Sequence, residues 1–262
     1  MLKRLSLVAA IASVFALAAC GSSSTDGAAP SSAAPATSAA APAELTVFAA
    51  ASLTGTFTEL GEQFEAANPG TKVTFNFGSS ATLAQQITQG APAAVFAAAS
   101  PATMKTVADA GLAGTQTVFV KNKLEIAVPP DNPAKVENLK DLTDPKVKVA
   151  LCAEQVPCGA AAVKALDAAG LKVTPVTLEQ DVKATLTKVE LGEVDAALVY
   201  KTDVIASAGK VTGIPFPEAD QAINDYPIAT LKDAPALAQK FVDLVLSQQG
   251  KDVLTKAGFE AP

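Results

Sequence analysis

The chain has 262 residues, of which 49% are hydrophobic and 18% charged, and its formal net charge at pH 7 is −6. A negative chain argues against nucleic-acid binding, because proteins that bind phosphate backbones carry an excess of lysine and arginine. The sequence has no histidine, which excludes Ser-His-Asp and Cys-His catalysis and histidine-ligated zinc in their usual forms.

The N-terminus has the pattern of an export signal. Lys3 and Arg4 precede an apolar stretch at residues 5–19, which is too short to span a bilayer comfortably, and Cys20 follows at once. The junction Leu-Ala-Ala-Cys at residues 17–20 resembles a bacterial lipobox. We therefore expect a lipoprotein signal peptide at 1–19 and an acylated Cys20. The alternative is a plain signal peptide with an incidental cysteine.

A low-complexity segment follows the signal. Apart from Asp26, residues 21–43 are all Gly, Ser, Thr, Ala or Pro, a composition typical of a solvated tether with a reach of roughly 25–30 Å. The folded part is expected to begin at Glu44, which leaves about 220 residues, enough for one large domain or two small lobes. Loss of Lys3 and Arg4 makes the mature chain still more negative. Any anion site must therefore rely on local hydrogen-bond donors.

The folded part alternates between predicted strands and predicted helices. Strands are expected at residues 45–50, 73–77, 95–98, 123–128, 148–151, 173–176, 196–199 and 226–229. Helices are expected at residues 54–67, 82–89, 101–110, 160–169, 182–191, 236–246 and 248–257. The patterns Thr56-x-x-Glu59 and Thr82-x-x-Gln85 indicate capping boxes at two helix starts. This alternation predicts an α/β fold with parallel-rich sheets and ligands at the carboxyl ends of the strands.

Two cysteines remain in the exported part, Cys152 and Cys158. A disulfide between them is the simplest interpretation for an exported protein, and it would stabilise by about 2 kcal/mol and fix the shape of a short loop. Free thiols or redox chemistry are the alternatives, although the spacing is not that of a C-x-x-C motif.

Five short segments at predicted strand ends carry small side chains, free backbone N–H groups or a tyrosine. They lie at residues 49–54, 78–83, 156–159, 180–183 and 198–203. The first four would present N–H groups at the positive end of a helix dipole, a common way to hold an oxyanion. Taken singly, each is a weak signal, because a serine there is usually only a helix cap and a strand-terminal tyrosine usually packs at the core edge.

Taken in order, these segments resemble the molybdate-binding proteins of ABC transporters, the ModA family, over about residues 45–259. The landmarks are AAASLT at 49–54, GSSATLAQQI at 78–87, GAPAAVFAAAS at 90–100, VPCG at 156–159, EQDVKATL at 179–186, ALVYKTD at 197–203, FPE at 216–218 and YPIA at 226–229. The resemblance implies a two-lobed, type II periplasmic-binding fold with a ligand cleft between the lobes and a two-strand hinge. Residues 44–121 and 216–262 would form the first lobe, and residues 122–215 the second.

The resemblance also implies the ligand contacts and the role. Ser52 and Ser80 would donate through hydroxyl and backbone N–H, Cys158 and Val182 through backbone N–H, and Tyr200 through its phenol. Molybdenum would enter only as bound molybdate or tungstate, with no cofactor and no catalysis. The partners implied are the permease and ATPase of an ABC importer. The protein would be a monomer held to the extracytoplasmic face of the cell membrane by its lipid anchor alone.

One residue departs from the family pattern. Ala94 stands where the family usually has an aspartate, which puts the positioning of the cleft in doubt but not a ligand contact. Cys158 stands where a small residue such as alanine is common, an exchange that an amide donor tolerates.

Three other functions stay open at this point. The first is binding of another tetrahedral oxyanion, sulfate or phosphate, because sequence does not give the size of a cage. The second is a metal-binding lipoprotein that uses Tyr200 and Tyr226 with carboxylates. The third is an exported enzyme with Ser52 as nucleophile, which the absence of histidine and of a G-x-S-x-G elbow disfavours.

Overall fold

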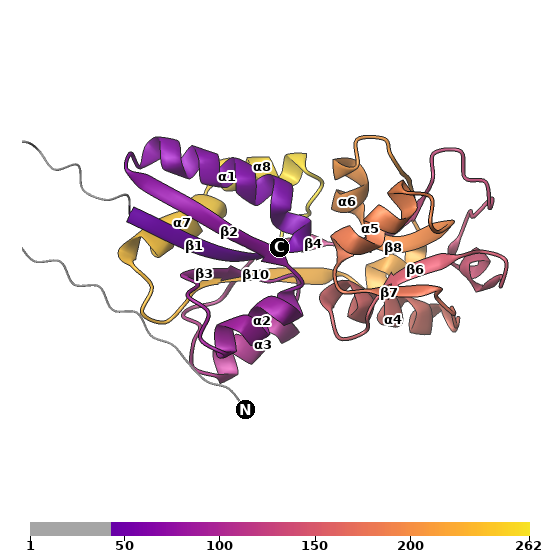
Figure 1. The fold of residues 1–262 in the computed structure, drawn as a ribbon, viewed down its shortest axis with the longest axis horizontal. Coiled ribbons are helices and arrows are strands. Elements are labelled where there is room, and N and C mark those ends of the chain that lie inside the picture. The colour runs from indigo at the N-terminus through magenta and orange to yellow at the C-terminus, as the bar shows by residue number, and fades with distance from the viewer. Residues whose placement is uncertain (1–42) are drawn as a thin grey trace, which may run out of the picture. The chain divides into compact units, whose positions relative to one another are not determined.

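The computed structural model describes residues 43–262, so the predicted signal peptide, Cys20 and nearly all of the predicted linker lie outside the described residues. The described part contains two five-stranded sheets (Figure 1). The first has the order β2-β1-β3-β10-β4, formed by β1 (Ala43–Ala50), β2 (Thr71–Gly78), β3 (Val95–Ala97), β4 (Thr117–Asn122) and β10 (Asn224–Thr230). We call the half built on this sheet the first lobe.

Helices cover both faces of the first sheet, because β1 is apolar on both sides. Val47 packs in one cluster with Phe57 and Phe241, and its neighbour Phe48 packs in another cluster with Leu83. The first cluster lies under α1 (Thr54–Ala67), α7 (Ala236–Leu246) and α8 (Gln248–Lys256), and the second lies under α2 (Ser80–Thr88) and α3 (Pro101–Asp109). Continuous apolar strands are what a sheet buried on both faces requires.

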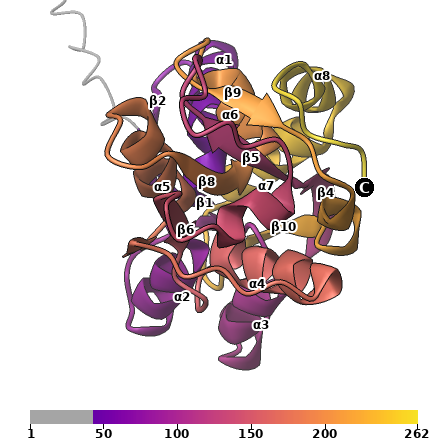
Figure 2. The same ribbon diagram turned by 90° about the vertical axis from the view of Figure 1, so that its right-hand side faces the viewer.

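The second sheet has the order β7-β6-β8-β5-β9 and forms the second lobe. Its strands are β5 (Leu124–Val128), β6 (Val149–Cys152), β7 (Thr177–Glu179), β8 (Ala196–Tyr200) and β9 (Thr212–Ile214). In Figures 1 and 2, α4 (Pro157–Ala169) lies on the opposite side of this sheet from α5 (Val182–Glu190) and α6 (Lys201–Ala206). Each sheet is mixed, with one antiparallel strand, β10 in the first and β5 in the second.

The chain passes between the lobes twice. It leaves the first sheet after Asn122, and it re-enters that sheet at Asn224, which is the register partner of Asn122. Phe216 and Ala219, beside and within the short helix η3 (Pro217–Gln221), pack in the core of the second lobe. The return to the first sheet therefore comes after these residues, whereas the sequence predicted it at Phe216.

Several predicted details differ from the structure. The strand predicted at 173–176 lies instead at β7, where Thr177 pairs with Ala150 and leaves Val176 60% exposed. Both predicted capping boxes are wrong, because the N-cap residues of α1 and α2 are Leu53 and Ser79, and Thr56 and Thr82 lie inside the helices. Strands β4 and β9, helix α6 and the 3₁₀ turn η2 (Leu139–Thr143) were not predicted. Among residues 43–262, no helix is long and apolar enough to cross a membrane.

Candidate functional site

The described structure brings all five predicted site residues to one small cavity between the lobes. Its lining comprises Ala50, Ala51, Ser52, Gly78, Ser79, Ser80 and Ala99 from the first lobe and Val156, Pro157, Cys158, Asp181, Val182 and Tyr200 from the second. The cavity measures about 20 Å³ on a scale where one water molecule needs roughly 10–15 Å³. An ion of a few atoms suits such a space better than a sugar or a peptide does.

The start of α5 explains why the amide of an apolar residue, Val182, is available to a ligand. The Asp181 carboxylate accepts hydrogen bonds from the amides of Lys183 and Ala184 at 2.8 and 2.9 Å, and the Asp181 carbonyl accepts from the amide of Thr185 at 3.1 Å. These bonds occupy every free amide of the first turn except that of Val182. The cap therefore leaves one donor open, beside the cavity.

The start of α4 is held by a proline, a glycine and a disulfide. Pro157 occupies the first helical position, where its missing N–H costs nothing, and the next amide is that of Cys158. Cys158 is bonded to Cys152, which confirms the predicted disulfide. A Cβ on Gly159 would overlap the carbonyl oxygen of Ala153, so only glycine lets the first turn lie this close to the end of β6. Together these features fix the position of the Cys158 amide.

The two first-lobe segments at the cavity also begin helices without side-chain caps. The short helix η1 (Ala51–Leu53) follows Ala50, and α2 follows Ser79, whose hydroxyl makes no capping bond. Helices elsewhere in the described chain, such as α3 and α8, have ordinary serine caps at Ser100 and Ser247. Uncapped starts leave amides free for a ligand, including those of Ser52 and Ser80.

The hydrogen of the Ser80 hydroxyl is free because a neighbouring backbone amide donates to the hydroxyl oxygen. The amide of Ala99 donates to Ser80 Oγ at 2.9 Å, and a backbone amide can only donate. Ser80 Oγ is therefore the acceptor, and its own hydrogen remains for another partner. With Ser80 in the cavity wall, that partner is whatever the cavity holds.

The Ser52 hydroxyl is ordered in the same way through two further residues. Asn122 Oδ1 accepts from the Lys123 amide at 3.0 Å, so the Asn122 amide group donates to Thr202 Oγ1 at 2.8 Å and lies 3.5 Å from Tyr226 Oη. Tyr226 Oη and Ser52 Oγ form a hydrogen bond of 2.9 Å in which either hydroxyl can donate. When Tyr226 is the donor, Ser52 keeps its hydrogen for the cavity.

The Tyr200 hydroxyl completes the set. Its oxygen lies 2.7 Å from Nδ2 of Asn224, which donates to it, so the phenol hydrogen is also left over. Burial raises the pKa of Tyr200 well above its ordinary value and raises the pKa of Tyr226 too. Both phenols are therefore protonated at neutral pH and can donate hydrogen bonds.

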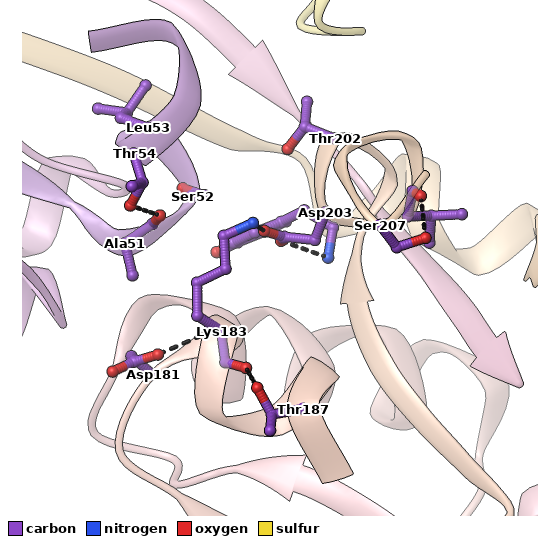
Figure 3. Close-up of polar contacts among 12 residues, drawn as sticks. Ala51, Ser52, Leu53, Thr54, Asp181, Lys183, Thr187, Thr202, Asp203 and Ser207 are labelled. Atoms are coloured by element: carbon purple, nitrogen blue, oxygen red, sulfur yellow. Dashed lines mark hydrogen bonds and ion pairs between the residues drawn. The ribbon is translucent and has the colours of Figure 1, made fainter. Parts of the chain in front are cut away.

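No lysine or arginine lines this cavity in the described chain, and its one charged lining residue, Asp181, is engaged as the cap of α5. The neighbouring Lys183 points away to Asp203, at 3.1 Å (Figure 3). Asp203 is fully buried, and its second oxygen accepts from the Tyr200 amide at 3.2 Å. Burial raises the pKa of Asp203, and Lys183 opposes the rise. The donors facing the cavity are thus uncharged.

The described residues contain no group of three or more His, Cys, Asp or Glu side chains placed to hold a metal ion. Tyr200 and Tyr226 do lie together, with ring centroids 6.1 Å apart, but each is occupied by an uncharged hydrogen-bond partner. Ala94 precedes β3, whereas the cavity lies beyond the other end of that strand, at Ala99. Ala94 itself therefore does not line the cavity.

Sequence reasoning missed Ser79, Asn122 and Asn224. The Ser79 hydroxyl is buried in the cavity wall without a hydrogen-bond partner among the described atoms. The two asparagines are terminal strand residues, Asn122 the last of β4 and Asn224 the first of β10, and asparagine is disfavoured in strands. Nothing else in the local sequence indicated a polar role at these positions.

Residues 45–260 match the family model described as bacterial extracellular solute-binding protein. The molybdate-binding protein ModA of Mycobacterium tuberculosis is 45% identical over 256 residues, which cover 95% of this chain and 94% of the relative. ModA of Escherichia coli is 32% identical over 236 residues, covering 82% and 88%. The periplasmic molybdate-binding protein of Azotobacter vinelandii has the same fold, with a TM-score of 0.72 at 23% identity over 83% of this chain and 99% of that one.

Proposed function

The chain belongs to the ModA family of bacterial extracellular solute-binding proteins, and we propose that it is the molybdate-binding component of an ABC importer, with tungstate as a second ligand. Members of this family bind solutes and are not enzymes, so no catalytic role is assigned to Ser52. The permease and the ATPase that receive the ligand are the partners that family membership implies.

One observation supports this assignment most strongly. The hydroxyls of Ser80 and Tyr200 each accept a hydrogen bond from a neighbouring N–H group, so their hydrogens are left over at a cavity that Ser52, Cys158 and Val182 also line. Charge-assisted hydrogen bonds are worth about 1.5–3 kcal/mol each, so such donors together can hold a dianion without a basic side chain. They also overcome the net negative charge of the chain, which acts over a longer range.

We further propose that the lobes close on the ligand. The donors come from both lobes, so an ion that engages all of them binds the closed form better than the open form. The two chain crossings near Asn122 and Asn224 would serve as the hinge. Small-angle scattering should show the protein contracting when molybdate is added, and an unchanged radius of gyration would contradict closure.

The lipid anchor stays a proposal that the sequence at residues 17–20 supports. Expression of the full chain in a bacterium should yield a membrane-associated protein with an acylated Cys20. A Cys20→Ala variant should lose the acyl chain, as measured by mass spectrometry of the N-terminal peptide. A wild-type N-terminus without lipid would contradict the anchor.

The experiment that tests the proposed function is calorimetry with four oxyanions, molybdate, tungstate, sulfate and phosphate. Molybdate and tungstate should bind tightly, and phosphate should bind weakly because its remaining proton needs an acceptor that the cavity donors do not supply. Strong binding of sulfate alone would overturn the assignment in favour of another tetrahedral oxyanion.

A further inference from the structure

Asn224, the first residue of β10, makes hydrogen bonds to both lobes from one amide nitrogen. Its Nδ2 lies 2.8 Å from the carbonyl oxygen of Ala99 in the first lobe, 2.7 Å from Tyr200 Oη in the second, and 3.4 Å from the carbonyl oxygen of Pro157. The side chain is buried, at 6% exposure. Ala99 and Tyr200 both line the cavity, so Asn224 lies directly behind the site.

The chemistry of these partners fixes the direction of every bond. Carbonyl oxygens only accept hydrogen bonds, so the group of Asn224 that faces Ala99 and Pro157 is the NH₂ group and not the amide oxygen. Tyr200 Oη, bonded to the same nitrogen, is therefore an acceptor. The other nearby hydroxyl is that of Tyr226, which also influences the pKa of Tyr200 and lies 2.9 Å from Ser52 Oγ. Because Tyr200 Oη accepts from Asn224, its own hydrogen is available to a ligand in the cavity that Tyr200 lines.

We propose that Asn224 is a positioning residue that directs the Tyr200 hydroxyl to donate into the cavity. This inference rests on the proposed function, because it assigns Asn224 a part in the same binding site. While Tyr200 Oη accepts from Asn224, the phenol hydrogen cannot point at Asn224 and is offered to the ion instead. Asn224 itself need not touch the ligand.

Two substitutions of similar size separate this role from a structural one. Asn224→Leu removes the donor and adds no charge, so the Tyr200 hydroxyl is free to turn away, and molybdate affinity should fall about threefold to tenfold. Asn224→Asp places a carboxylate where it accepts the Tyr200 hydrogen and repels the ion, so affinity at pH 8 should fall more than tenfold.

The pH dependence of molybdate affinity in the Asn224→Asp variant is the more specific test. Burial between carbonyl oxygens raises the pKa of the new carboxyl, and once protonated it can donate again, so its affinity should recover relative to wild type as the pH falls from 8 to about 5.5. The other titratable groups around Tyr200 are Tyr226, Asp203 with Lys183, and Asp181 at the start of α5. All are present in both proteins, so the ratio of the two affinities isolates residue 224.

A double-mutant cycle shows whether Asn224 acts through Tyr200. In a Tyr200→Phe background, Asn224→Leu should cause no further loss of affinity, because the hydroxyl that it positions is gone. An equal loss in both backgrounds would contradict the inference, and so would an Asn224→Asp variant with wild-type affinity or with no pH-dependent recovery. Wild-type protein that binds no molybdate would instead refute the proposed function.

A measurement on the unaltered protein guards against variants that fail to fold. The chain has two tyrosines, Tyr200 and Tyr226, and no tryptophan, so tyrosine Raman bands report on this site alone. Addition of molybdate should shift the Raman bands of one tyrosine to those of a phenol that both donates and accepts a hydrogen bond. Tyrosine bands that do not change when the ligand binds would refute the proposed donor role. Thermal unfolding of each ligand-free variant supplies the control for folding.

Discussion

The hydroxyl oxygens of Ser52 and Tyr226 lie 2.9 Å apart, although 174 positions separate the two residues in the sequence. Tyr226 is fully buried and stands behind Ser52 as seen from the cavity lining, of which it is not a part. The contact holds the Ser52 hydroxyl in place, as the Ala99 amide holds the Ser80 hydroxyl and Asn224 holds the Tyr200 hydroxyl.

Tyr226→Phe should therefore weaken molybdate binding several-fold without removing any ligand contact. The Ser52 hydroxyl would lose its hydrogen-bond partner and its fixed direction, at a cost of about 1 kcal/mol. Calorimetry on Tyr226→Phe, Ser52→Ala and the double variant measures the coupling. Full additivity of the two losses would show that Tyr226 does not act through Ser52.

Val182 offers a direct test of a backbone donor. Val182→Pro removes the amide hydrogen at the first position of α5, where proline is tolerated, and the extended Asp181 before it suits a following proline. Affinity should fall about 10- to 100-fold, corresponding to about 1.5–3 kcal/mol. Val182→Ala, the matched control, should bind almost as wild type. Comparable affinities in all three proteins would exclude the Val182 amide as a ligand.

Two substitutions of Asp181 distinguish its role as a helix cap from the effect of its negative charge. Asp181→Asn keeps a good helix cap but removes a negative charge beside the anion, so we expect tighter molybdate binding with little change in stability. Asp181→Ala removes the cap as well, which should cost about 1 kcal/mol of unfolding free energy and open the amides of Lys183 and Ala184. Titration and thermal unfolding of both variants provide the check. Weaker binding by the asparagine variant would show that the carboxylate helps the site.

Asp203 predicts a pH dependence of stability. Burial raises its pKa above the ordinary value of 3.8, so the folded state holds the proton more tightly than the unfolded chain does. This contribution to stability is complete below pH 3.8 and is lost as the pH rises through the folded-state pKa. Relative to Asp203→Asn, the wild-type protein should lose unfolding free energy as the pH is raised from about 4, as measured by urea denaturation. A relative gain over that interval would mean that Lys183 outweighs burial.

The resemblance to the ModA family predicted a common site for Ser52, Ser80, Cys158, Val182 and Tyr200, and the structure brings all five to one cavity. Their ligand role remains to be tested by binding. The apolar run at residues 45–50 also predicted the strand that the structure shows as β1.

What the sequence did not predict has two physical causes. The capping-box patterns at Thr56 and Thr82 placed the N-cap residues too late, because η1, α1 and α2 begin without side-chain caps next to the cavity. Local rules fail most readily at functional sites, where free amides serve a ligand instead of the helix. The roles of Asn122 and Asn224 depend on partners 24 to 125 positions away, which no local pattern encodes.

A crystal structure of the protein with molybdate tests the central claim most directly. We predict that the ion lies between the lobes, with its oxygen atoms within hydrogen-bonding distance of the hydroxyls of Ser52, Ser80 and Tyr200 and of the amides of Cys158 and Val182. No lysine or arginine should contact it, and Lys183 should stay paired with Asp203. Molybdate bound elsewhere, or neutralised by the Lys183 ammonium, would contradict an uncharged cage.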